Sequence, residues 1–139
     1  MKKTILTIMG IAIAICAIAN DGSNTLKVVI KNFENTEGKA RVTYFDSSED
    51  FLKTGKMQIV NITNKEEIIV TFENVPSATL AVSVVHDENA NGELDTGVFG
   101  IPTEDYGFSN DAKGSFGPPS FEDCQFSIDQ NKTIEININ

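Results

Sequence analysis

The chain has 139 residues, of which 20 are acidic and 11 are basic, and 40% are hydrophobic. Its net charge of −9 argues against nucleic acid and anionic membranes as partners, because both carry negative charge and would repel the protein.

Residues 1–19 are typical of a secretory signal peptide. Two lysines at the N-terminus precede an almost uninterrupted apolar run, Ile5 to Ile18, and small residues stand at positions minus one and minus three of a cut after Ala19. The apolar run is shorter than the roughly 20 residues that a membrane span needs, so we expect cleavage rather than an uncleaved anchor. A secreted or periplasmic location follows.

Cys16 raises a second possibility, a lipidated N-terminus, although Ile15 stands where such a signal needs a small residue. Simple cleavage leaves a mature domain, residues 20–139, with nine basic and 20 acidic residues, a net charge of −11 and no transmembrane segment. About 120 residues suit one domain. Cys124 is then the one cysteine left, so no internal disulfide is expected, and no nearby histidine or second cysteine suggests a zinc ligand or a nucleophile.

The mature chain predicts about seven strands, because short segments alternate apolar and polar residues and are separated by turn residues. We expect the first two strands to form a hairpin across Asn35–Gly38, and a helical turn to begin at Ser47 or Ser48 and close at Gly55. This pattern is typical of a single antiparallel β-sandwich, with a closed barrel as the alternative. The predicted strands are Leu26–Phe33, Ala40–Phe45, Met57–Ile62, Glu67–Phe72, Thr79–His86, Phe121–Ile128 and Thr133–Ile138.

The fifth predicted strand, Thr79–His86, is the most continuous apolar segment and is expected to be central. It leads directly into an acidic loop that resembles the first part of a calcium-binding loop. Side-chain or backbone oxygens fall at positions one, three, five, seven and nine, with Gly92 at position six for the sharp turn. The candidate Ca²⁺ ligands are Asp87, Asn89, Asn91, Glu93 (through its backbone carbonyl) and Asp95.

The predicted calcium shell is incomplete. Position twelve, where a bidentate glutamate normally closes the shell, is Val98. A more distant carboxylate such as Glu104 or Asp105, or water, would have to supply the missing oxygen. The alternative is an ion-free turn in which asparagine and aspartate side chains bond to their own backbone.

A long segment rich in aromatic residues and glycine follows the acidic loop, and we expect it to be an irregular excursion at one end of the sandwich. Three of its aromatic side chains, Tyr106, Phe108 and Phe116, suggest two interpretations. They form a satellite cluster that caps the sandwich, which we favour, or they form a platform that binds a glycan or a peptide.

Several motifs span essentially the whole mature chain. They are His86–Asp95, Phe99–Pro102, Tyr106–Asn110 and Phe116–Asp123, with Tyr44–Asp46 and Phe51–Leu52 as further matches. In these motifs and their order the sequence resembles domain-of-unknown-function family 2141, a family of secreted bacterial proteins. The resemblance implies a compact β-sandwich of the immunoglobulin-like or transthyretin-like kind, and it implies no activity. In that family a small residue such as alanine would be more usual than Cys124.

These observations predict a non-enzymatic, exported module of unknown biological role that holds a structural calcium ion. The first alternative is an accessory domain that binds an extracellular glycan or protein through the aromatic segment 99–121. A hydrolase with His86 as its base, oriented by Asp87 or Asp95, is the second alternative, but no serine lies in a nucleophile-elbow context. We expect a monomer.

Overall fold

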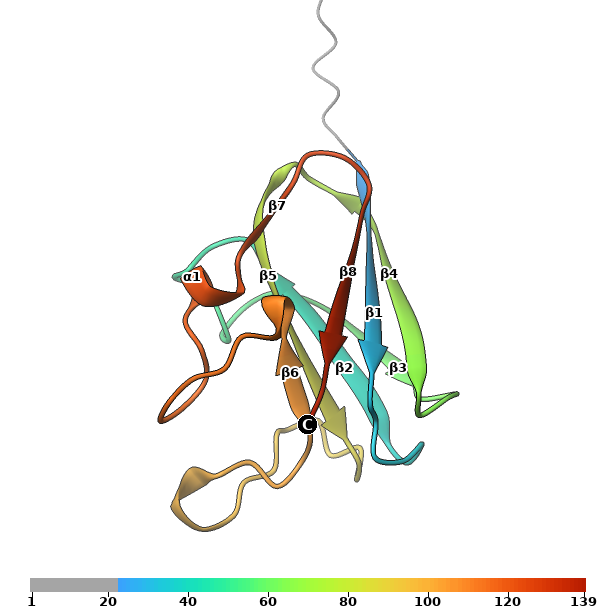
Figure 1. Cartoon of the computed structure of the whole chain (residues 1–139), viewed down its shortest axis with the longest axis vertical. Helices are drawn as coiled ribbons and strands as arrows, with labels where there is room; N and C mark the ends of the chain where they lie inside the picture. Colours follow the sequence, from blue (N-terminus) through green and yellow to red (C-terminus); the bar gives the residue numbers. More distant parts are fainter. Residues whose placement is uncertain (1–22) are drawn as a thin grey trace, which may run out of the picture.

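The computed structural model describes residues 23–139, so the predicted signal peptide and its cleavage site lie outside the described residues. Eight strands form two sheets whose facing sides enclose the core, and the only α-helix of the described part is one short turn (Figure 1). The predicted all-β sandwich is confirmed.

The elements follow the predicted alternation closely in the first two-thirds of the chain. Their bounds are β1 Asn24–Lys31, β2 Lys39–Phe45, β3 Lys56–Asn61, β4 Glu67–Val75, β5 Ala78–Asp87, η1 Val98–Gly100, β6 Tyr106–Phe108, η2 Ser109–Asp111, α1 Phe121–Cys124, β7 Phe126–Ile128 and β8 Lys132–Asn137, where η denotes a 3₁₀ turn.

The three-stranded sheet has the order β4-β1-β8, and the five-stranded sheet has the order β3-β2-β5-β6 with β7 also paired to β5. The predicted hairpin between the first two strands is therefore wrong, since β1 and β2 lie in different sheets. The connection between them is anchored in the core by buried Phe33, whose backbone N–H donates to the carbonyl of Lys65 at 2.9 Å. A second departure from the antiparallel expectation is that β8 runs parallel to β1.

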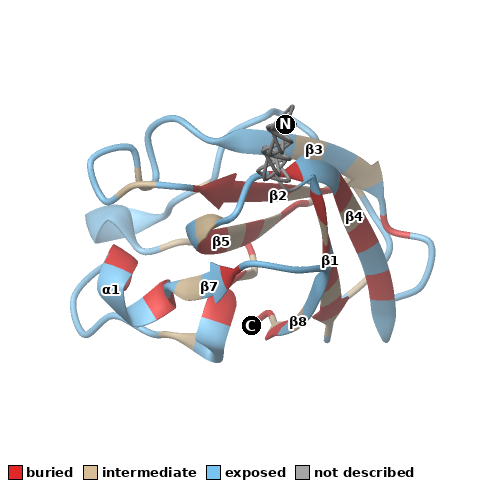
Figure 2. Cartoon of the chain, turned by 90° about the horizontal axis from the view of Figure 1, so that it is seen from above, coloured by how far each residue is buried: buried red, intermediate tan, exposed pale blue. Residues whose placement is uncertain are grey.

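The core consists of the inward-facing half of each strand. Along β1 and β4, buried residues alternate with half-buried or exposed ones, as the red, tan and blue stripes of Figure 2 show. β5 contributes Leu80, Val82 and Val84, all at 0% exposure. Strand alternation thus places one apolar face of each sheet inside, and burial of these side chains is the main stabilising contribution to the fold.

A second, smaller cluster lies on the outer face of the five-stranded sheet. It contains buried Phe45, Ala81, Phe108, Phe121 and Cys124, with Phe51 packed against it. This cluster attaches the turn after β2, the strand β6 and the helical turn α1 to the sheet.

The strand predicted for Phe121–Ile128 is wrong in its first half. Ser120 begins a helical turn there, because its Oγ accepts the N–H of Asp123 at 3.2 Å while the Asp123 carboxylate accepts the N–H of Ser120 at 3.3 Å. This reciprocal capping box favours a helical start over an extended one. Cys124 is consequently a fully buried residue of a helical turn and not part of a strand.

The segment between the acidic loop and α1 is less irregular than predicted. It contains the 3₁₀ turns η1 and η2 and the short strand β6, which pairs with β5. The eighth strand of the sandwich arises here. No helix among residues 23–139 is long and apolar enough to cross a membrane.

Candidate functional site

The acidic loop leaves the end of β5 and extends from one end of the sandwich, at the bottom of Figure 1. Asp87, the last residue of β5, is only 2% exposed, and its carboxylate is aimed back at the loop. One carboxylate oxygen accepts the N–H of Asn91 at 3.1 Å, and the other accepts the N–H of Gly92 at 2.9 Å. Gly92 has a φ of 86°, so the predicted sharp turn at position six is present.

The remaining side chains of the loop gather around Asp95. The Nδ2 groups of Asn89 and Asn91 both donate to the Asp95 carboxylate, the second at 2.8 Å. The Oδ1 atoms of the same two asparagines each accept a backbone N–H two residues further along the chain, at 3.1 and 2.9 Å. The loop thus brings the predicted ligand side chains of Asn89, Asn91 and Asp95 into contact, and the carboxylate of Asp87 bonds to the backbone of the same loop. Glu93, which was predicted to act through its backbone carbonyl, has an exposed side chain.

Glu104 joins the two ends of the loop. Its side chain is 7% exposed, and its two carboxylate oxygens accept the backbone N–H groups of Glu88 and Asp95, each at 3.0 Å. Glu104 is one of the two distant carboxylates considered for the missing oxygen of the calcium shell. It does reach the loop, but both of its oxygens accept backbone N–H groups. Nothing in the local sequence pattern indicates this bracing role.

The loop offers a partial set of oxygens for a cation. Calcium takes six to eight oxygen ligands, and carboxylates and amide oxygens are suitable ones. Asp87 and Asp95 supply two carboxylates, and two asparagines lie between them in the sequence. Among residues 23–139, however, no three His, Cys, Asp or Glu side chains are grouped so that they would hold a metal ion, and Val98 at position twelve is 75% exposed. Any ion would therefore depend on the asparagine and backbone oxygens.

His86 lies behind the loop and is fully buried. Its Nε2 is 2.9 Å from the carbonyl oxygen of Glu37, and its ring packs edge-on against Phe33 with 5.4 Å between ring centroids. Its Nδ1 has no hydrogen-bond partner in the described part of the chain. Next to Glu37, Gly38 packs so closely on the loop that a Cβ there would lie 2.0 Å from the carbonyl oxygen of Asp87.

A protein-family model described as "Uncharacterized protein conserved in bacteria (DUF2141)" matches residues 28–136. The chain belongs to this family. The match begins within β1 and ends within β8, so nearly all of the sandwich and the whole acidic loop lie within the DUF2141 domain. No curated protein and no solved structure matches the chain.

The aromatic residues Tyr106, Phe108 and Phe116 do not form one surface in this DUF2141 domain. Phe108 is buried, and Tyr106 packs against it with 5.9 Å between ring centroids. Both belong to the cluster on the outer face of the five-stranded sheet, which confirms the predicted satellite cluster for these two residues. Phe116 does not join that cluster and is fully exposed at a loop tip.

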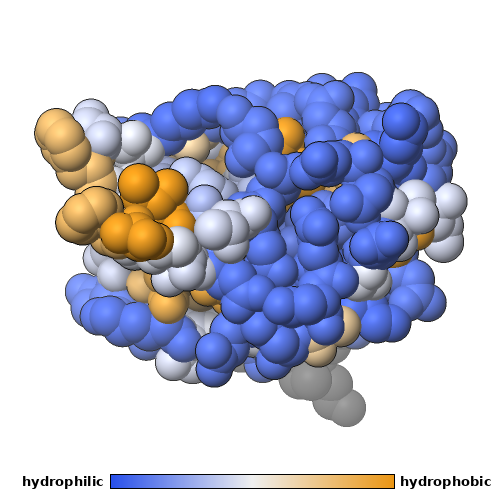
Figure 3. All heavy atoms as spheres, turned by 90° about the horizontal axis from the view of Figure 1, so that it is seen from below, coloured by the Kyte–Doolittle hydropathy of each residue, from blue (hydrophilic) through white to orange (hydrophobic). Residues whose placement is uncertain are grey.

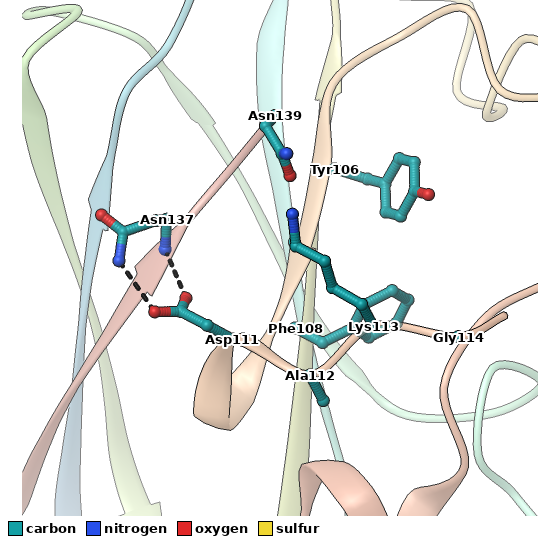
Figure 4. A pocket seen from close by; sticks show the side chains of 9 residues that line it. Tyr106, Phe108, Asp111, Ala112, Lys113, Gly114, Asn137 and Asn139 are labelled. Atoms are coloured by element: carbon teal, nitrogen blue, oxygen red, sulfur yellow. Dashed lines mark hydrogen bonds between the residues drawn. The ribbon is translucent and has the colours of Figure 1, made fainter.

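A small pocket of about 150 Å³ opens beside Tyr106 (Figure 4). Asp111 lies at its edge, where its carboxylate accepts the backbone N–H and the Nδ2 group of Asn137, both at 2.9 Å. These bonds join η2 to β8. Because the carboxylate already accepts these two donors, the pocket has a structural explanation, and we assign it no ligand.

Proposed function

We propose that this protein is an exported, non-enzymatic module whose Asp87–Asp95 loop binds one calcium ion. The observation that carries the proposal is the folded shape of the loop. The carboxylate at position one accepts the N–H of the glycine at position six, and the side chains at positions three and five both donate to the carboxylate at position nine. Short oxygen-bearing side chains at alternate positions around one glycine are the arrangement that suits this hard cation.

The charges support the same proposal. Asp95 and Asp87 are two carboxylates within nine residues, and among residues 23–139 the side-chain partners of the Asp95 carboxylate are two neutral amide groups. A divalent cation would neutralise both. With two carboxylates in the shell, we expect a dissociation constant of about 10⁻⁴–10⁻³ M, in the range of extracellular modules.

Export is supported by residues 1–19, whose charge, apolar run and small residues suit a cleavable leader. The absence of catalysis is supported by His86, the one histidine of the chain, whose ring is fully buried and bonded to a backbone carbonyl. Mass spectrometry of the protein secreted by its host tests the first point: we expect a chain that begins at Asn20.

Titration calorimetry with calcium chloride, on protein freed of metal by a chelator, tests the ion. We expect heat of binding, a higher melting temperature in millimolar calcium, and an affinity at least about tenfold weaker for Asp95→Asn, because a ligand charge is lost. Asp129→Asn makes the same chemical change at an exposed turn between β7 and β8 and should bind like the wild type. No heat and an unchanged melting temperature with the wild-type protein would refute the proposal.

A glycan- or peptide-binding function has less support. It rested on three aromatic side chains, and only Phe116 is freely exposed, while Phe108 belongs to the buried outer cluster. A glycan array probed with the wild type and with Phe116→Ser would revive this function only if the array gave a signal that the variant lost.

A further inference from the structure

The tip of the loop between β5 and β6 carries an exposed apolar knob, which we define as Val98, Phe99 and Ile101. Their side chains are 75%, 96% and 64% exposed. Apolar atoms gather at one edge of the molecule in the view of Figure 3. The knob is braced at its base, because the N–H of Gly97 donates to the carbonyl of Ile101 at 2.7 Å and Thr96 forms an isolated β-bridge with Pro102.

Phe99 is unusual within the knob. Its φ is 64°, a left-handed conformation that is uncommon for a bulky side chain and that glycine or asparagine adopts more easily. A phenylalanine that is strained and 96% exposed gains nothing from the fold of its own chain. Its ring is therefore best explained by a contact outside the chain.

The surroundings of the knob are acidic. No lysine or arginine occurs between Lys65 and Lys113, and Glu93, Asp95 and Asp105 stand within a few residues of its two ends. A partner surface that accepts the knob should therefore combine an apolar socket with positive charge.

The same chain carries such a socket. On the outer face of β2, β3 and β5, a groove of about 410 Å³ is bounded by the turn that follows β2. Its apolar surface includes Leu52, Met57 and Val85, its cations are Arg41 and Lys53, and no acidic residue lines it. The absence of acidic residues is notable in a chain with 20 of them.

Arg41 shows that the groove is short of acceptors. Its Nε is buried and has no hydrogen-bond partner among residues 23–139, and its Nη2 contacts only the sulfur of Met57, at 3.8 Å. A buried N–H without an acceptor costs free energy, and a carboxylate from an incoming group would satisfy it.

We propose that the knob of one copy docks into the groove of a second copy of this chain. The two surfaces match in three respects: both are apolar at their centres, one has an acidic surround and the other has cations, and the groove has room for the phenyl ring. Because knob and groove are different surfaces, the contact is heterologous. In a dimer, one copy keeps a free groove and the other keeps a free knob, so further copies can add at both ends. This proposal replaces the expected monomer at high protein concentration.

Sedimentation of purified protein at concentrations up to about 0.5 mM tests the proposal, since a contact of this small size should be weak. In buffer with chelator, we expect the average mass of the wild type to rise beyond two chains. Phe99→Asn removes the phenyl ring of the knob, and Arg41→Glu cancels the positive charge of the groove, where Lys53 is the other cation, so each variant alone should remain a single chain. An equimolar mixture of the two should form one-to-one dimers, because one member keeps its groove and the other its knob.

A matched pair separates specific docking from general stickiness. Ile101→Thr in the knob should weaken the association at least fivefold, whereas Ile69→Thr should leave it unchanged, because Ile69 has a similar exposure of 58% but lies on β4 of the other sheet. If Arg41→Glu fails to fold, Lys53→Glu on the exposed turn replaces it.

Three outcomes would overturn the proposal. They are a wild type that stays a single chain at every concentration, a Phe99→Asn variant that still associates, and a mixture of the two variants that stays monomeric while the wild type associates. Binding of the wild type to phosphatidylcholine vesicles that is lost in Phe99→Asn, without self-association, would assign the knob to a lipid surface instead.

Discussion

Replacing Glu104 with glutamine is expected to lower the free energy of unfolding by about 2 kcal/mol, since a bond to a charged acceptor contributes roughly 1.5–3 kcal/mol. Both oxygens of the buried carboxylate accept backbone N–H groups, from Glu88 and Asp95, at 3.0 Å. Glutamine keeps one acceptor oxygen and turns an NH₂ donor toward the other N–H group. One of the two loop ends therefore loses its partner. For a domain of this size the melting temperature should fall by about 6–12 °C.

Urea denaturation and thermal melting of wild type and Glu104→Gln measure this effect. The control is Glu93→Gln, which makes the same chemical change on an exposed side chain of the same loop and should alter stability by less than about 0.5 kcal/mol. The slope of the urea transition should be the same in all three proteins, because the fold is the same. A Glu104→Gln variant within about 0.5 kcal/mol of the wild type would refute the bracing role.

Three further predictions concern single positions. Gly38→Ala should lower the free energy of unfolding by more than about 3 kcal/mol, since its Cβ would lie 2.0 Å from the carbonyl oxygen of Asp87. Gly92 has a φ of 86° and open space around it, so Gly92→Ala should lower the free energy of unfolding by only about 1 kcal/mol. Urea denaturation measures both. Burial raises the pKa of the Cys124 thiol from 9.0 to about 11. The buried, protonated thiol therefore contributes fully to the stability of the folded protein below pH 9.0, and this contribution is lost as the pH rises through about 11. Peptide mapping after alkylation at pH 8 should find Cys124 unmodified in the folded protein and modified in urea. Phe99→Asn should leave the melting temperature of the dilute protein unchanged or raise it, because asparagine adopts the left-handed φ of 64° with less strain and the change uncovers no core residue. A fall of more than about 3 °C would show that the ring supports the fold.

The strands were predictable because their periodicity is local. Leu26, Val28 and Ile30 alternate with exposed or half-buried residues, and each is buried as expected. The pairing of the strands, in contrast, cannot be read from the sequence of each strand alone. β1 and β2 are separated by a short turn-like segment, yet Phe33 within it is buried, and this anchoring sends the chain from one sheet to the other.

The helical turn α1 shows two local signals in competition. Phe121 and the residues after it alternate in a way that suggests a strand, while Ser120 followed three residues later by Asp123 is a helix-capping signal. The capping signal prevails because both side chains satisfy backbone N–H groups that a strand edge would leave open. The burial of Cys124 follows from that helical turn.

The candidate calcium loop was predictable as a set of residues, but its support was not. Asp87, Asn91 and Asp95 form their contacts within nine residues, which spacing alone indicates. Glu104 approaches only because β6 pairs with β5 and returns the chain to the loop. Contacts of this kind depend on sheet pairing and have no signature in a short window of sequence.

The bracing of the loop limits what calcium is expected to do. Glu104 satisfies the backbone at both ends of the loop, and Gly38 packs directly against Asp87, so the loop is held in shape by the protein itself. An ion would then add only its binding free energy, and at ten times the dissociation constant this is about 1.4 kcal/mol. We therefore expect calcium to raise the melting temperature by about 4–8 °C and to leave the circular dichroism of the folded protein unchanged. A large gain in ordered structure on adding calcium would mean that the ion, and not Glu104, folds the loop.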